Sequence, residues 1–211
     1  MAYDLEEQEK IDALRAWWDR YGTLIAVVII AAVLVFAGWR AWQWYQGHQA
    51  GQAMGYFEAL ETSAMQPTED SLPRIKAASE TLRQDFPDSG YTSRGVLIAA
   101  AALRSQGDLD GAREQLAWLV AQNKDPALVP LAKLRLAGIL LEQQQYDQAL
   151  AHLDAAPPAF AGLYADRRGD ILIAQGKKDE AIQAWQTAIT QLGDAPLAQV
   201  IQLKIDANGG A

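Results

Sequence analysis

The chain carries one long uncharged apolar run near its start, followed by apolar positions spaced three and four residues apart. The run reads YGTLIAVVIIAAVLVFAGW, from Tyr21 to Trp39. As a helix it would extend about 28 Å at about 1.5 Å per residue, close to the thickness of a bilayer's hydrocarbon core. The pattern predicts a single transmembrane helix, which we place with its flank at residues 21–45.

Aromatic side chains bracket this run on both sides. Indole rings favour the headgroup layers of a membrane, because one edge is polar and the rest is apolar. Most of the tryptophans of the chain stand at these two ends, and we expect them to act as membrane-interface anchors: Trp17, Trp18, Trp39, Trp42 and Trp44. A buried core helix, the simplest alternative, would not explain the paired groups.

A cleaved signal peptide is the more serious alternative to an anchor. Signal peptides begin with a short basic region and end in a cleavage site of small residues. Here a leader at residues 1–20 precedes the run and is acidic on balance, and the bulky sequence GWRAWQWYQ follows it. The sequence therefore favours an uncleaved anchor.

Lysine and arginine indicate which end of the span faces the cytoplasm, because basic flanks tend to stay on that side. Lys10, Arg15 and Arg20 precede the uncharged run, whereas only Arg40 follows it before Arg74. This asymmetry predicts a cytoplasmic N-terminus and an exported, periplasmic C-terminal domain.

Beyond residue 45 the apolar spacing is helical, and turns rich in glycine and proline divide it into segments of helix length. Three segments share a helix, a tight turn, and a second helix in which an alanine is followed four positions later by a large apolar residue: Ala112 and Leu116, Ala149 and Leu153, Ala181 and Trp185. A small residue stands twelve positions before each alanine, and a leucine stands three positions after that small residue. These pairs are Ala100 and Leu103, Ala137 and Leu140, and Gly169 and Leu172. Small residues let paired helices approach closely, as in tetratricopeptide repeats.

The repeats are irregular, since the three alanines are separated by 37 and 32 residues. Ala78 stands 34 residues before Ala112, which suggests a degenerate first pair at residues 50–64 and 71–86. The segment from Pro196 to Ala207 resembles a closing helix. We therefore predict an all-α fold: one transmembrane helix, then a tetratricopeptide-like α-solenoid of about three to four helix pairs at residues 46–207, with a C-terminal capping helix and a tail at 208–211. A generic helical bundle with accidental spacing is the alternative.

Composition and motifs argue against most kinds of chemistry. The net charge is −8 without a basic run, which argues against nucleic-acid binding, and the absence of cysteine excludes disulfides and thiolate sites. His48 and His152 stand far apart, so we expect two solvated histidines rather than a metal site. Phosphate-binding loops and nucleophile elbows are absent, and acids such as Asp108 and Asp179 fall where they would cap helices. We expect no enzyme activity and no cofactor.

The candidate binding surface is apolar. The helix that begins near Leu131 contains leucines on the side opposite its core-facing positions. Apolar residues occur at equivalent positions in the neighbouring repeats. We expect a groove for a partner helix or an unfolded client segment at these positions: Leu97, Leu134, Leu141 and Ile173. Burial against the first helix pair is the alternative.

Several segments follow one another in a specific order: EEQEKIDALRAWWDRYG, the span ending in GWRAWQ, LIAAAALRSQGDLDGAREQLAWLV, RRGDILIAQGKKDEAIQAWQTAI and the terminal LAQVIQLKID. In this order of segments the chain resembles the ancillary SecYEG translocon subunit family over essentially its full length. The resemblance implies a single-pass inner-membrane protein that associates with the SecYEG translocon and with a membrane-anchored periplasmic chaperone of the prolyl-isomerase type. Its implied role is to help exported client proteins pass from the channel to folding factors.

Two other functions remain open at the level of sequence. Repeat domains on a single anchor also suit a scaffold for another envelope complex, such as a pilus or division assembly, because a fold does not dictate a function. The acidic leader could instead contact a soluble cytoplasmic factor, which would make the protein a regulator.

Overall fold

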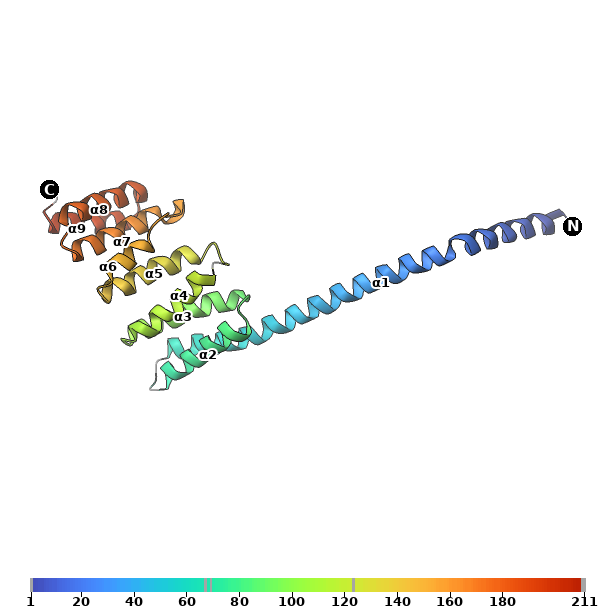
Figure 1. The fold of residues 1–211 in the computed structure, drawn as a ribbon, viewed down its shortest axis with the longest axis horizontal. Coiled ribbons are helices and arrows are strands. Elements are labelled where there is room, and N and C mark those ends of the chain that lie inside the picture. Colours follow the sequence, from blue (N-terminus) through green and yellow to red (C-terminus); the bar gives the residue numbers. More distant parts are fainter. Residues whose placement is uncertain (1, 67, 69, 123, 210–211) are drawn as a thin grey trace. The chain divides into compact units, whose positions relative to one another are not determined.

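The computed structural model describes residues 2–66, 68, 70–122 and 124–209, with side chains from residue 9 onward. This part of the chain is helical, without a strand, as Figure 1 shows. The α-helices are α1 (Ala2–Met65), α2 (Ser71–Asp85), α3 (Gly90–Ser105), α4 (Leu109–Gln122), α5 (Val129–Glu142), α6 (Tyr146–Ala151), α7 (Ala161–Ala174), α8 (Lys178–Leu192) and α9 (Pro196–Ala207), with a short 3-10 helix at Pro158–Phe160 before α7. The all-α prediction is confirmed.

The chain divides into two compact units, residues 1–51 and 52–211. The first consists of α1 up to Gly51. Among the described residues, α1 is the one helix long and apolar enough to cross a membrane, and 6% of its most apolar window is buried inside the protein. A core helix of a soluble protein would be mostly buried, so this exposure is what an anchor requires.

The second unit is a series of antiparallel helix pairs. The last turns of α1 pack with α2, then α3 with α4, α5 with α6, and α7 with α8, while α9 packs on α8. The alanines at the repeat positions are fully buried, at 0% exposure for Ala112, Ala149 and Ala181. The predicted first pair is also present, because Leu60 of α1 shares a core with Ile75 and Leu82 of α2.

The turns within the pairs α3–α4, α5–α6 and α7–α8 have the same construction. Each contains one residue in the left-handed region: Gly107 (φ 83°), Gln144 (φ 60°) and Gly176 (φ 79°). The amide of the following residue donates to a carbonyl five positions earlier: Asp108 to Leu103, Gln145 to Leu140, and Lys177 to Leu172. These are the carbonyls that a helix leaves unpaired at its C-terminus, so each turn closes one helix as it starts the next.

Polar contacts between neighbouring pairs join residues about one repeat apart. The hydroxyl of Tyr164 donates to the carbonyl oxygen of Pro130 at 2.9 Å, 34 positions earlier. The buried hydroxyl of Ser79 donates to Oε1 of Gln115 at 2.6 Å, 36 positions later. Contacts of this spacing are what a solenoid requires, because each repeat touches only its neighbours.

One second helix is much shorter than the spacing predicted. The segment containing Ala149 has the pattern of a full helix, but α6 has 6 residues and ends at Ala151. Pro157 and Pro158 follow, and neither could donate a backbone hydrogen bond to a continuing helix. The third pair therefore has a short second helix.

Candidate functional site

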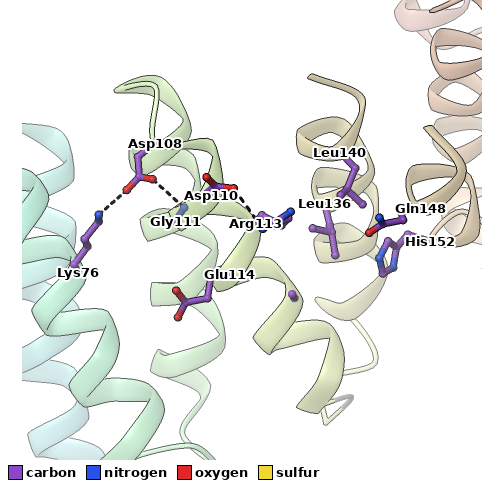
Figure 2. A pocket seen from close by; sticks show the side chains of 11 residues that line it. Lys76, Asp108, Asp110, Gly111, Arg113, Glu114, Leu136, Leu140, Gln148 and His152 are labelled. Atoms are coloured by element: carbon purple, nitrogen blue, oxygen red, sulfur yellow. Dashed lines mark hydrogen bonds and ion pairs between the residues drawn. The ribbon is translucent and has the colours of Figure 1, made fainter. Parts of the chain in front are cut away.

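A groove of about 630 Å³ lies where α2, α4, α5 and α6 meet. Figure 2 shows charged side chains from α2 and α4 on one side and apolar and polar side chains from α5 and α6 on the other. Its lining residues are Lys76, Asp108, Asp110, Gly111, Arg113, Glu114, Ala117, Leu136, Leu140, Gln148 and His152. The short α6 contributes only Gln148 to this lining, and His152 follows directly after the helix.

Asp108 organises the charged side of the groove. It stands immediately before α4, and its Oδ1 accepts a hydrogen bond of 2.9 Å from the amide of Gly111, as a helix-capping carboxylate does. Its Oδ2 lies 2.6 Å from Nζ of Lys76 on α2. The hydrogen bond from Lys76 and then the one from Gly111 lower the pKa of Asp108, so it is ionised at neutral pH. Capping, expected for this residue, is confirmed.

The other charges on this side are also paired. Nη2 of Arg113 lies 3.4 Å from Oδ1 of Asp110, which also accepts a hydrogen bond of 3.0 Å from the side-chain Nε2 of Gln143. Glu114 forms an ion pair of 3.0 Å with Arg83 of α2. The rim therefore offers positive and negative groups to a ligand, each already partly neutralised by a neighbour.

Leu136 and Leu140 of α5 form the apolar part of the groove, and α6 contributes Gln148 and His152. His152 is half-buried here, which corrects the expectation of a fully solvated residue. It lies in the groove because α6 ends at Ala151, directly before it. Burial, and secondarily the charge of Lys133, lowers the pKa of His152, so the neutral ring is favoured.

A second polar cluster joins α9 to α7 and α8. Nζ of Lys204 lies 2.6 Å from Oδ1 of Asp166 and 2.7 Å from Oδ1 of Asp170. The ammonium group is also 5.8 Å from the centre of the Trp185 ring, whose Nε1 donates to Asp170 at 3.3 Å. One cation thus holds the capping helix against the last pair.

The structure distributes the four predicted partner-binding residues over three first helices. Leu97 on α3 is 6% exposed and belongs to the central core, against which Leu134 and Leu141 of α5 pack while remaining half-buried. Ile173 on α7 is half-buried against the separate C-terminal core. None of the four lines the groove, which is built mainly by second helices.

The five predicted interface tryptophans all lie on α1 and are exposed. The Trp17 ring lies tilted against Trp18 and Tyr21, and the Trp39 ring lies tilted against Phe36. Their role at a membrane surface stays a prediction.

The arrangement suits binding better than catalysis. The part of the chain that the structure describes contains no group of three or more His, Asp or Glu side chains placed to hold a metal ion. The groove combines a small apolar area, from Leu136 and Leu140, with charged side chains of both signs.

Comparisons with known proteins agree with this architecture. Residues 15–210 match the model of a tetratricopeptide repeat-like domain family. The chain is 31% identical to the ancillary SecYEG translocon subunit of Neisseria gonorrhoeae, over 98% of this chain and 99% of that protein. It is 30% identical to the subunit of the same name from Haemophilus influenzae, over 98% and 99%, and 27% identical to that of Escherichia coli, over 95% of each.

A solved structure shares the fold at much lower sequence identity. MamA from Desulfovibrio magneticus RS-1, residues 41 to the end, superposes with a TM-score of 0.53 and 18% identity, over 75% of this chain and 88% of that one. At this level of identity the likeness concerns the arrangement of helices alone.

Proposed function

The chain belongs to the family of ancillary SecYEG translocon subunits, and from that premise we propose that it is a non-enzymatic, membrane-anchored partner of the Sec channel that helps exported proteins reach periplasmic chaperones. The observation that carries the proposal is the relationship over 98% of the chain, which includes the anchor as well as the repeats. A relationship through the repeats alone would support only a binding domain.

The proposed topology places residues 1–20 in the cytoplasm, the span at residues 21–45, and the repeat domain at residues 46–207 in the periplasm. The basic residues Lys10, Arg15 and Arg20 support this orientation, since they precede the span. The inner membrane is then the location, because the partner channel resides there.

Tethering is the proposed mechanism. A repeat domain anchored next to the channel would meet emerging segments at a raised effective concentration, because both stay at the same place on the membrane. Weak contacts then suffice for capture, and rapid release allows transfer to a chaperone. This explains how a groove of modest size could serve many clients.

Two surfaces are available for these contacts. The groove beside Leu136 and Leu140 offers apolar and charged groups together, whereas Leu134 and Leu141 offer half-buried apolar edges on α5. We assign client segments to the groove and the predicted chaperone of the prolyl-isomerase type to the face that carries Leu134. No cofactor takes part in either contact.

Affinity purification of the tagged full-length protein in mild detergent, followed by mass spectrometry, tests the assignment to the channel. Recovery of SecYEG and a periplasmic chaperone, absent from a control with an equally expressed unrelated single-span protein, is the expected result. Recovery of a pilus or division complex without SecYEG would instead support an envelope scaffold.

Photo-crosslinking distinguishes the two surfaces. A crosslinking residue at Gln148 in the groove should capture nascent exported chains, and one at Leu134 should capture the chaperone. Thr187, exposed on α8 outside the groove, is the matched control position. If both test positions capture no more than Thr187 in actively exporting membranes, the proposed contacts are wrong.

A further inference from the structure

The part of α1 that precedes the apolar run carries an apolar stripe of its own. Ile11, Leu14, Trp18 and Tyr21 are separated by three, four and three residues, which places them along one side of a helix. Their exposed fractions are 53%, 66%, 57% and 42%, so nothing in this unit covers them. Ala16 lies on the opposite side of the helical wheel.

This stripe continues directly from the span. The helix is unbroken from Ala2, and no proline occurs in its first 51 residues. The Trp18 ring packs over Gly22, where an added Cβ would lie 3.1 Å from the indole. With Tyr21 at the membrane surface, Ile11 would lie about 15 Å outside it at about 1.5 Å per residue.

The end of the leader farther from the span is acidic. The spacing of three and four continues in the sequence from Ile11 to Glu7 and Asp4. Residues 2–9, AYDLEEQE, contain four acids and no lysine or arginine. The series therefore changes from apolar positions beside the membrane to acidic positions away from it.

We infer that this stripe binds the cytoplasmic face of a multi-span membrane protein, in an apolar groove that begins at the membrane surface and ends among lysine and arginine side chains. The positive-inside rule concentrates such basic residues on the cytoplasmic loops of multi-span proteins. The anionic cytoplasmic leaflet would attract a basic helix and repel this acidic end. The inference rests on the proposed orientation, and under the proposed function the partner is the channel itself.

A photo-crosslinking residue placed at Leu14 in the full-length protein, in native membranes, tests the contact. We expect an adduct with an integral membrane protein at a yield about tenfold above that of the same residue at Ala16, since only one side of the helix meets the partner. Equal yields at the two positions, no adduct, a soluble partner, or lipid adducts alone would each overturn the inference.

Charge reversal tests the acidic end separately. The double variant Asp4→Lys and Glu7→Lys should lower the Leu14 adduct about tenfold, because two attractive pairs become repulsive. The matched variant Glu9→Lys and Asp12→Lys makes the same change in net charge at positions away from the stripe, and should leave the yield within about twofold. Immunoblots of carbonate-washed membranes confirm equal insertion, and an equal loss in both double variants would contradict the assignment.

The identity of the adduct separates this inference from the proposed function. Copurification of SecYEG without a Leu14 adduct would contradict the proposed contact of the stripe and leave the translocon role intact. A Leu14 adduct with a different multi-span protein, together with failure to copurify SecYEG, would support the stripe and overturn the translocon role.

Discussion

The indole of Trp185 occupies the space that Gly169 leaves open between α7 and α8. A Cβ added to Gly169 would lie 2.4 Å from both Cδ1 and Nε1 of the ring. The equivalent positions in the two preceding repeats pair an alanine with a leucine: Ala100 with Leu116, and Ala137 with Leu153. In this pair the largest side chain of the three thus packs against the smallest residue, so the two helices can still pack closely.

The substitution Gly169→Ala should therefore destabilise the C-terminal repeat. Alanine favours a helix more than glycine does, but the methyl group would displace a tryptophan that is 2% exposed. We expect the free energy of unfolding to fall by about 1–3 kcal/mol. Thermal melts of the full-length protein in detergent, followed by circular dichroism at 222 nm, would measure the change.

Gly138 provides the matched control for this experiment. It is also buried in a helix, but a Cβ there would lie 3.7 Å from the nearest atom, in Arg167, which is ordinary contact. Gly138→Ala should be neutral or stabilising, and Trp185→Leu in the Gly169→Ala background should recover part of the loss. Equal melting of Gly169→Ala and the unmodified protein would refute the steric argument.

The three repeat turns give a second prediction. Gln144 adopts the left-handed conformation that Gly107 and Gly176 adopt at equivalent positions. A residue with a Cβ is strained there, so Gln144→Gly should raise the free energy of unfolding by about 0.5–1 kcal/mol, and Gly176→Ala should lower it by about 1 kcal/mol. Chemical denaturation of the full-length variants would measure both. Destabilisation by Gln144→Gly would mean that its side chain contributes more than its backbone costs.

The repeat architecture could be read from the sequence because its determinants are local. Small and large residues at fixed spacings, such as Ala137 and Leu153, determine how two helices pack, and both stand in one repeat. The span could be read for the same reason, from a continuous uncharged run.

The groove could not be read in this way. It requires Lys76, Asp108, Leu136 and His152, which belong to three successive helix pairs, and it depends on the early end of α6. The apolar spacing around Ala149 favours a full-length α6, and only the pair of prolines at residues 157 and 158 indicates an interruption.

The Lys204 cluster gives a third prediction. Lys204→Met removes the cation shared by Asp166 and Asp170, whose side chains are mostly buried. Burial raises the pKa of Asp166, and its hydrogen bond from Lys204 only partly offsets this. We expect a loss of about 1–3 kcal/mol, since the cluster is only partly screened by water. Hydrogen exchange should accelerate mainly in α9.

An exposed pair serves as the control for this charge. Lys124 pairs with Asp88 where both side chains are more than half exposed, so Lys124→Met should cost less than about 1 kcal/mol.

Burial lowers the pKa of Lys204, but its hydrogen bonds to Asp166 and Asp170 outweigh this and raise it above 10.5. The stabilisation by Lys204 is therefore complete below pH 10.5 and is lost as the pH rises through the raised value. A constant difference between Lys204→Met and the unmodified protein across that range would contradict the assignment.

Because of His152, the stability of the protein should fall as the pH becomes mildly acidic. Its pKa is lowered from 6.5 by burial and then by Lys133, so the unfolded chain takes up a proton at a higher pH than the folded protein does. The contribution of the neutral ring is therefore complete above pH 6.5 and is lost as the pH falls from 6.5 through the lowered folded value. His152→Gln, which keeps a polar side chain of similar reach but cannot titrate, should flatten this part of the curve. Melting temperatures of the two proteins between pH 7.5 and 5, together with an NMR titration of the His152 ring, would measure the effect. Parallel curves for the two proteins, or a ring that titrates above 6.5, would show that the groove does not bury the histidine enough to matter.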